Sequence, residues 1–439
     1  MQSLKHLLLL TVVLSLFVTY DSVAQERRIL SLEELFALAE EQSATIDTSR
    51  KAVAEAEAAV EEAKTGRYPE IELTLSASYL GNGTLTDRDF SNSMGVKMPH
   101  LGNNFAAEAS QLIYGGGAVT NSIAMARLQE EMATVNLDAT RSRVHFMLTG
   151  FYLELAKMYA IMDVYDRNIA LAEELIADTE ARCREGMALT NDVTRHRLRL
   201  EQLKLARTEV ENTTLILSSE IATTIGLDPA TIIVPDAAVL ELALSREGEA
   251  YWQDVASDSS HELRRGEIAV AMGERAEELA RAERRPSVAL VAANHFDGPI
   301  TIEVPVVDKN FNYWYVGVGV SFKLSSLYKA NRTIQRHERA TEVSRSELSD
   351  LRDRKSLDVH ADYIRYEEGY VAVDTYTTNV GLAKENYRII ETRYRNDMVL
   401  VTEMVDAANQ LLEAELQLTI ARIDVVMRYH KLLFTAGTI

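Results

Sequence analysis

The chain has a single cysteine, Cys183, among its 439 residues, which excludes an intrachain disulfide and any cysteine-rich metal cluster. Basic residues are also scarce: 46 Lys and Arg stand against 66 Asp and Glu, a formal net charge of −20. Because phosphate binding needs clustered Lys and Arg, this balance argues against a nucleic-acid partner. A well-solvated acidic surface is the plain explanation of the charge.

Catalytic signatures are absent as well. The nine histidines are scattered, and the sequence has no His-Glu-x-x-His motif, no nucleophile elbow and no phosphate-binding glycine loop. His295 and Cys183 are therefore expected to be packing or surface residues. The chain is not expected to be an enzyme or to hold a cofactor or metal.

Proline is rare and unevenly placed. All seven prolines lie outside two blocks, 118–225 and 325–436, which also contain very few glycines. Stretches that long without helix breakers predict extended helices or coiled coil. At about 1.5 Å per residue, a helix over 118–183 would be on the order of 100 Å long. Heptad spacing supports side-by-side helices, at Met404, Leu411, Leu418, Val425 and Leu432 and at Leu203, Val210 and Leu217.

The N-terminus is typical of a secretory signal peptide. Lys5 precedes an apolar stretch at 7–18, and small residues at 22–24 offer a cleavage site before Gln25. We therefore expect residues 1–24 to be removed and the chain to be exported. No cysteine follows the cleavage site, so an N-terminal lipid anchor is not expected.

The mature chain carries a long internal repeat. A shift of 211 residues superimposes Tyr152 on Tyr363, Tyr159 on Tyr370 and Gly226 on Gly437, and a slightly larger shift superimposes Pro69 on Pro286. A repeat of this period means that one structural unit is used twice. The predicted halves are 25–235 and 236–439, each built as helix, strand, strand, helix.

The elements of each half follow from the periodicity. Helices are predicted over 31–65, where Ser31 and Glu34 form a capping box, and over 250–284. Alternating apolar and polar residues predict strands at 70–79, 104–114, 287–296 and 314–324.

These strands have about the length that a tilted strand needs to cross a bilayer, and aromatic residues cluster near their ends. An antiparallel sheet over a soluble core is the alternative. Four strands cannot close on themselves, because the smallest membrane barrels use about eight. If the sheet spans a membrane, several chains must share one barrel.

Several local patterns carry a family resemblance. They are Arg67-Tyr68-Pro69-Glu70-Ile71 and its second copy Arg285-Pro286-Ser287-Val288, Gln111-Leu112-Ile113-Tyr114-Gly115-Gly116-Gly117, Gly186 followed by Asn191-Asp192-Val193, and Glu403-Met404-Val405-Asp406-Ala407. Two ordered copies of this set resemble the TolC-type outer-membrane efflux channel family over essentially the whole mature chain. Pro69 and Pro286 would begin the strands, and Gly115 and Gly116 would end them.

The resemblance implies a mainly α fold with a small transmembrane β portion. Long coiled-coil helical hairpins would form a periplasmic tunnel, and three chains would supply a 12-stranded β-barrel in the lipid of the outer membrane. Such homotrimers are passive. They export small molecules or peptides when coupled to a periplasmic adaptor (membrane fusion) protein and an inner-membrane efflux pump or ABC exporter. The alternative is a periplasmic coiled-coil scaffold or interaction protein without a pore.

The resemblance also suggests site residues at the two hairpin tips, near 184–192 and 395–403. The candidates for adaptor contact are Gly186, Met187, Leu189, Thr190, Met398, Leu400 and Thr402. Turn formation and capping demand the same residue types, so a purely structural role is the alternative.

Glu403 and Asp406 share one helix face, and the matching family acids line the periplasmic aperture. Six carboxylates from three chains would favour cations, whereas a merely solvated surface pair is the alternative. Tyr394 matches a family aromatic near the closed tip. Val399 stands where an Arg often locks the aperture, and Asp397 replaces a common glycine, so the latch is expected to differ here.

Overall fold

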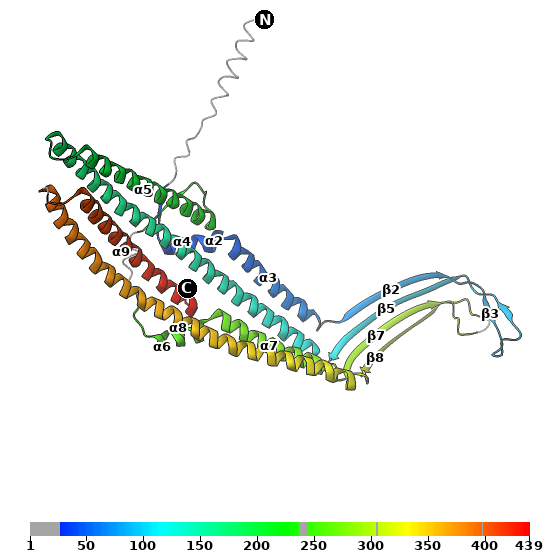
Figure 1. Ribbon diagram of the computed structural model, residues 1–439. Coiled ribbons are helices and arrows are strands. Elements are labelled where there is room, and N and C mark those ends of the chain that lie inside the picture. The colour runs from blue at the N-terminus through cyan, green and yellow to red at the C-terminus, as the bar shows by residue number, and fades with distance from the viewer. Residues whose placement is uncertain (1–26, 237–243, 304–305, 397) are drawn as a thin grey trace, which may run out of the picture. The chain divides into compact units, whose positions relative to one another are not determined.

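A computed structural model of the chain describes residues 27–236, 244–303, 306–396 and 398–439. The predicted signal peptide and Asp397 lie outside these ranges. Figure 1 shows a mainly helical chain with a four-stranded sheet. The helices are α2 (Leu32–Gln42), α3 (Ala44–Thr65), α4 (Ala118–Arg184), α5 (Thr190–Thr224), α6 (Glu249–Ser259), α7 (His261–Ala282), α8 (Ser326–Arg395) and α9 (Val401–Ala436). The strands are β1 (Arg27–Leu30), β2 (Glu70–Tyr79), β3 (Gly83–Leu85), β4 (Met94–Val96), β5 (Leu101–Tyr114), β6 (Ile232–Pro235), β7 (Ser287–Gly298) and β8 (Phe311–Ser321).

The chain divides into two compact units. Among the described residues, the hairpin unit comprises those of Met1–Ser49, Leu137–His261 and Arg352–Ile439, and the sheet unit those of Arg50–Asn136 and Glu262–Leu351. Each unit therefore draws on both predicted halves of the chain.

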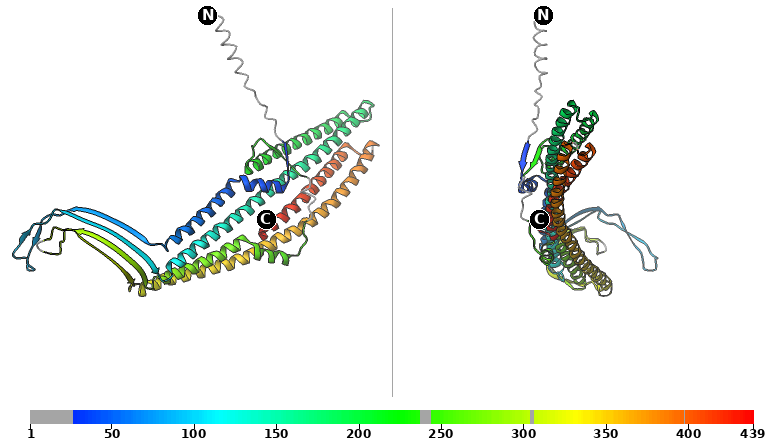
Figure 2. Two further views of the ribbon diagram at one scale, coloured as in Figure 1. Left: turned by 180° about the vertical axis from the view of Figure 1, so that it is seen from behind. Right: turned by 60° about the vertical axis from the view of Figure 1, so that its left-hand side comes forward.

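The hairpin unit contains two long helical hairpins. Helices α4 and α5 form the first and α8 and α9 the second, and both turns lie at the same end of the unit (Figure 2). The expected side-by-side packing is confirmed: Val164 of α4, Leu203 of α5 and Leu412 of α9 form one buried cluster. The heptad residues Met404 and Leu432 are fully buried.

Both hairpins end in the same backbone motif. Gly226 follows α5 with φ +73°, and Gly437 follows α9 with φ +81°. In each case the amide of the residue after the glycine donates to a carbonyl five residues earlier: Leu227 to Ala222 at 2.8 Å and Thr438 to Leu433 at 3.0 Å. This left-handed cap favours glycine, which explains why the repeat keeps a glycine at both places.

The shorter helices differ from the sequence prediction. Residues 31–65 and 250–284 were each expected to form one helix, but each is divided in two, at Ser43 and at Ser260. Both serines leave the helical region, with ψ of 117° and 114°. Neither proline nor glycine stands at these breaks, so no helix-breaking residue marks them in the sequence. The predicted capping box is confirmed, with the Glu34 amide donating to Ser31 Oγ at 3.2 Å and the Ser31 amide to Glu34 Oε2 at 2.8 Å.

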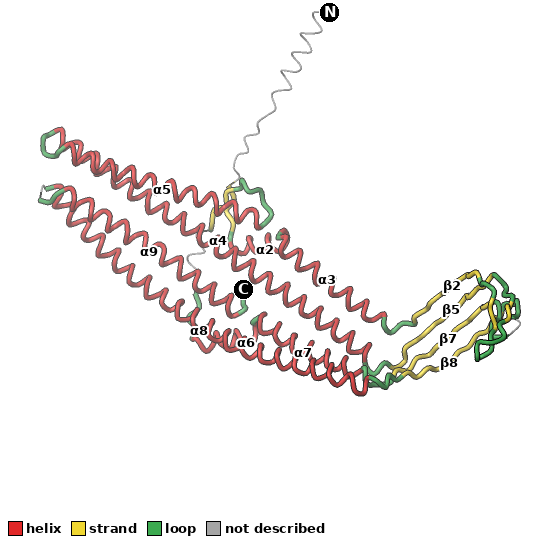
Figure 3. The backbone as a smooth tube through the Cα atoms, turned by 45° about the vertical axis from the view of Figure 1, so that its right-hand side comes forward, coloured by secondary structure: helices red, strands yellow, loops and turns green. Residues whose placement is uncertain are grey.

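The sheet unit contains an antiparallel sheet in the order β2-β5-β7-β8 (Figure 3). Strand β2 matches its prediction at both ends, and β5 and β7 are a few residues longer than expected. The last predicted strand, 314–324, is displaced to Phe311–Ser321, because the amide of Ser326 already turns back to the carbonyl of Lys323 at 2.8 Å. Two pairings were not predicted: parallel β1–β6 in the hairpin unit and the β3–β4 hairpin in the sheet unit.

The four-stranded sheet has one apolar and one polar face. Leu73 pairs with Ala107 of β5, while its neighbour Thr74 points to the other face, as strand geometry requires. The apolar face is exposed within the chain: Leu73 is 68% and Trp314 is 74% accessible. This sheet therefore leaves a large hydrophobic surface uncovered, which marks a lipid or protein contact.

Candidate functional site: the paired turns of the helical hairpins

The first turn joins α4 to α5 and displays the residues predicted there. Gly186 has φ +77°, and the Met187 amide donates to the Arg182 carbonyl at 2.9 Å, which closes a left-handed cap. Met187 and Leu189 are exposed, at 53% and 70%. Thr190 begins α5, and the Leu189 amide donates to Asp192 Oδ2 at 3.2 Å, so the turn ends in a side-chain cap.

The second turn, between α8 and α9, has a matching backbone hydrogen bond. The Met398 amide donates to the Arg393 carbonyl at 2.9 Å, as Met187 does in the first turn. Met398 and Leu400 are exposed at 73% and 69%, and Thr402 is exposed as well. Every predicted tip residue thus lies on or beside a turn and is accessible or partly so; their contact with an adaptor stays a prediction.

The acidic pair lies on the first turns of α9. Glu403 and Asp406 are both exposed, and Asp406 Oδ2 accepts a hydrogen bond from Gln410 Nε2 at 2.7 Å. Between them on the helix, Met404 turns inward and is fully buried. The two carboxylates therefore share the solvent face, as their spacing predicts. Their place at an aperture stays a prediction.

Tyr394, near the end of α8, lies at a junction between the hairpins. It is only 6% exposed, and its hydroxyl lies 3.4 Å from Thr179 Oγ1 of α4 and 3.4 Å from His196 Nε2 of α5. Its carbonyl accepts a hydrogen bond from Arg182 Nη1 at 2.9 Å, and the same guanidinium lies 5.4 Å from the ring centre. One tyrosine thus ties the second hairpin to both helices of the first.

His196 is the residue of this junction that sequence reasoning missed. It is 3% exposed, and burial lowers its pKa below the usual range, while Asp192 acts in the opposite direction. The signal was present: His196 follows Val193 by three residues and precedes Leu200 and Leu203, so it occupies the buried face of α5. A buried, neutral histidine fits a hydrogen bond with the Tyr394 hydroxyl.

Val399, where the sequence resemblance led us to expect a different latch, packs on the apolar part of the second turn. It is partly buried against Tyr394, Val401 and Met404, which form an apolar cluster. At this position the described contact is therefore hydrophobic.

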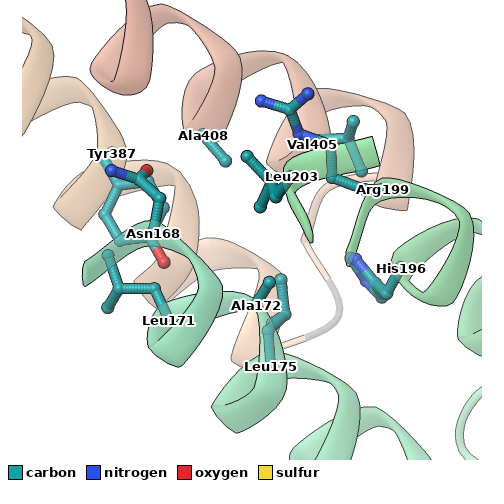
Figure 4. Close-up of a pocket in the computed structure, with 10 residues that line it drawn as sticks. All are labelled: Asn168, Leu171, Ala172, Leu175, His196, Arg199, Leu203, Tyr387, Val405 and Ala408. Atoms are coloured by element: carbon teal, nitrogen blue, oxygen red, sulfur yellow. The ribbon is translucent and has the colours of Figure 1, made fainter. Parts of the chain in front are cut away.

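A small cavity lies behind the junction, between α4, α5, α8 and α9. Its volume is about 30 Å³, and its lining is mostly apolar (Figure 4). The lining residues with polar groups are Asn168, His196, Arg199 and Tyr387. About 10–15 Å³ suffices for one water molecule, so the cavity is far too small for an exported solute.

A larger and more polar groove opens beside it, between α5 and α9. We call it the basic groove; its volume is about 330 Å³, and its lining residues are Arg195, Leu198, Arg199, Gln202, Thr402, Val405 and Asn409. The α5 residues follow each other at helical spacing, as do the α9 residues, so each helix contributes one face.

In the sheet unit the predicted boundary residues stand where helices and strands meet. Pro69 and Pro286 directly precede β2 and β7. Gly116 has φ +64°, and a Cβ there would lie 2.7 Å from the Arg285 Cβ, while Arg285 Nη1 donates to the Gly116 carbonyl at 2.7 Å. Gly115 leaves little space too, since a Cβ would lie 2.9 Å from Leu112. These positions are structural.

Other chemistry is limited in the part of the chain that the structure describes. No group of three His, Cys, Asp or Glu side chains there is arranged to hold a metal ion. Cys183 is half-buried, with Sγ 3.8 Å from Thr190 Oγ1, and His295 lies 3.7 Å from Glu108 in the sheet.

No described helix has an apolar segment long enough to cross a membrane.

Neither the protein-family models nor the curated proteins yield a match to this sequence. Solved structures do match over nearly the whole chain. VceC, an outer membrane protein of Vibrio cholerae, superimposes with a TM-score of 0.76 at 13% identity, covering 92% of this chain and 96% of its own. CusC superimposes with a TM-score of 0.76 at 13% identity and covers 92% of both chains. The outer-membrane channel OprN gives 0.73 at 14% identity, over 93% of this chain and 90% of its own. The chain therefore has the fold of these outer-membrane channels, as the sequence resemblance predicted.

Proposed function

We propose that the chain is one subunit of a homotrimeric channel-tunnel of the outer membrane. The observation that carries this proposal is the four-stranded sheet with its exposed apolar face and its two free edges, β2 and β8. Adjacent strands are antiparallel throughout, so β2 and β8 run in opposite directions. Strand β8 of one copy can therefore pair with β2 of the next in the same antiparallel pattern. Three copies give a barrel of twelve strands, within the range of membrane barrels.

The two faces of the sheet support this assignment. The apolar face carries exposed Leu73, Leu75, Val316 and Val318, which in water would be an aggregation hazard. Lipid covers such a face, while the opposite face, with Glu72 paired to Glu108, lines a water-filled interior.

The exposed residues of the hairpin unit support the same arrangement, in which two different surfaces of neighbouring copies meet. Exposed Leu205 and Leu215 lie 15 and 25 residues from the start of α5, and exposed Leu382 and Val371 lie 13 and 24 residues from the end of α8. Rotation about an axis along the helices leaves the height of each residue along that axis unchanged. The exposed apolar residues of α5 in one copy can therefore meet those of α8 in the next copy. Because the surfaces differ, the contact is heterologous and closes a ring rather than a two-fold dimer.

The channel is passive and exports small molecules or peptides, with energy supplied by an inner-membrane pump and a periplasmic adaptor that contacts the hairpin turns. The sequence resemblance and the fold of VceC, CusC and OprN support this role. Glu403 and Asp406 border the periplasmic aperture and attract cations, and Tyr394 holds the turns together on the closed side.

Two measurements on the detergent-extracted protein test the proposal. Native mass should give three copies, and a planar bilayer should show discrete conductance steps. Recovery in the soluble periplasmic fraction without detergent, as a monomer that conducts nothing, would instead identify a helical scaffold.

A further inference from the structure

An aromatic stack stands on the polar face of the four-stranded sheet. Phe311, Tyr313 and Tyr315 alternate along β8, and His295 reaches them from β7. The ring centre of His295 lies 5.0 Å from that of Tyr313 and 6.3 Å from that of Tyr315, with the ring planes 16° and 14° apart. Phe311 continues the stack beyond Tyr313 at 5.4 Å. The three rings of β8 are exposed on a face that water covers in the proposed barrel, so their presence there needs an explanation.

The stack ends at Tyr315. Its side chain is 47% exposed, and among the described residues its ring contacts no aromatic ring other than His295. The next residues of β8 on the same face are Gly317 and Gly319. A Cβ placed on Gly317 would meet no atom within 4 Å, and one on Gly319 would meet only the Ala289 carbonyl oxygen at 4.0 Å. The ring of Tyr315 therefore stands at the border of open space over bare backbone.

Neither glycine is required by the local fold of the sheet. Gly317 and Gly319 are not among the residues with positive φ, so their backbone is open to any side chain. The register of β7 and β8 continues past them without a bulge. Within the described ranges no segment packs closely on either residue. Glycine inside a strand weakens it and often marks a place where a ligand approaches the backbone closely.

Acidic side chains lie beside this open space. Glu108 of β5 pairs with Ala293 of β7, which pairs with Tyr315 of β8, so the three stand in one row. Two strand spacings, about 10 Å, separate Glu108 from Tyr315. Glu72 of β2 lies directly opposite Glu108, and like charges at such positions destabilise a sheet. The four strands contain no Lys or Arg, so a cation from outside the sheet would relieve this repulsion.

We propose that this shelf, with Tyr315 as its wall and Gly317 and Gly319 as its floor, binds planar aromatic cations on their way through the barrel. The ring of the solute stacks on Tyr315, and its positive charge lies toward Glu108. Aromatic rings stack with one another and attract cations, and the carboxylate adds charge complementarity. The inference rests on the proposed function, because that function places this face in the water-filled interior. It adds a substrate class and the residues that select it.

Titration of the detergent-extracted full chain with N-methylacridinium, a planar fluorophore with a permanent positive charge, tests the shelf. Saturable binding is expected. Anthracene-2-sulfonate, a planar anion of similar size, should bind about ten-fold more weakly, because it keeps the stacking but reverses the charge. In a planar bilayer the cation, added on the side of the barrel, should block the current, whereas the anion should not.

Substitutions locate the bound cation. Gly317→Leu fills the floor of the shelf, has open space for its Cβ and should weaken binding about ten-fold. Gly95→Leu is the matched control, because Gly95 of β4 is equally open and lies outside the shelf; binding should be unchanged. Tyr315→Phe keeps the ring and should bind as the parent does, whereas Tyr315→Leu and Glu108→Gln should each weaken binding several-fold.

The proposal is overturned if N-methylacridinium binds no more tightly than the sulfonate. It is equally overturned if binding survives Gly317→Leu or Tyr315→Leu, since the glycines would then serve only the curvature of the sheet. All residues of the shelf belong to one chain, so the titration decides the matter whatever the oligomeric state. Failure of the proposed function would appear separately, as a monomeric mass and the absence of conductance steps.

Discussion

The Tyr394 hydroxyl lies 3.4 Å from His196 Nε2, so a residue at the end of α8 is tied to the buried face of α5. Thr179 of α4 lies at the same distance from that hydroxyl. The two hairpins are thus linked near their turns by a polar junction beside an apolar cluster.

We expect Tyr394→Phe to loosen this junction. A buried hydrogen bond contributes about 0.5–1.5 kcal/mol, so removing the hydroxyl should lower unfolding stability by roughly that amount. In a planar bilayer the variant should spend more time in a conducting state. Tyr387→Phe is the control, because Tyr387 packs on the same cluster and its hydroxyl forms no hydrogen bond within the described residues. Equal conductance of the two variants would remove Tyr394 from the closing mechanism.

Acid should weaken the same junction. Burial holds the His196 pKa below its ordinary value of 6.5, so the unfolded chain takes up a proton at higher pH than the folded one. Stability is therefore complete above about pH 6.5 and is lost as pH falls from there toward the lowered pKa. His145 and His430 also have lowered pKa values and contribute to the slope.

The contribution of His196 can be separated by substitution. His196→Gln keeps a polar side chain without the titration, so its stability and conductance should vary less between pH 7.5 and 5.5 than those of the parent. His430→Gln is the comparison: it should flatten the stability profile and leave the pH dependence of conductance intact. A parent-like conductance profile in His196→Gln would contradict this assignment.

The acidic pair of α9 should govern ion selectivity. Glu403→Ala with Asp406→Ala removes six carboxylates from a trimer, so cation selectivity should weaken and single-channel conductance should change, upward if the pair narrows the passage. Reversal potentials in a salt gradient measure this directly. Glu413→Ala, at another exposed position of α9, should leave selectivity unchanged. Identical selectivity in both variants would make Glu403 and Asp406 ordinary surface residues.

Alanine substitution should lower the stability of the chain by different amounts at Gly186 and Gly116. Gly186→Ala forces an alanine into φ +77° with open space around it, so we expect a loss of about 1–2 kcal/mol. Gly116→Ala has the same backbone problem and would also place its Cβ 2.8 Å from the Ala282 carbonyl oxygen. Thermal unfolding should therefore show the larger drop for Gly116→Ala. The reverse order would mean that the helix–strand junction adapts more easily than the turn.

The sheet allows a test with neighbouring residues. Leu73→Arg places a cation on the apolar face, at a cost of about 2–4 kcal/mol if that face lies at the bilayer midplane. Thr74→Arg, one residue along β2, places it on the polar face and should be tolerated. The yield of folded trimer after extraction measures both. Equal yields would argue that lipid does not cover the Leu73 face.

The strands and long helices were predictable because their periodicity is uninterrupted. Strand β2 and helix α4 were located almost to the residue from alternation and from the absence of breakers. The helix breaks at Ser43 and Ser260 were not predicted, because serine is compatible with a helix and only packing decides whether the helix continues.

The junction was harder to predict than the elements. Tyr394 was identified through the family resemblance, but its partner His196 sits on another helix, almost two hundred residues away in the chain. One sequence places His196 on a buried face and gives no indication of what it faces. The basic groove likewise depends on two helices, α5 and α9, brought together only by the fold.

The order β2-β5-β7-β8 has one further consequence. Because each chain contributes an even number of alternating strands, its β8 edge can pair antiparallel with the β2 edge of another copy, whatever the number of copies. Strand direction alone therefore permits a barrel built from any number of chains. In the proposed assembly we therefore expect the angle between the helical hairpins of adjacent subunits to determine the copy number, so variants that change ring size should map to α5 and α8 rather than to the strands.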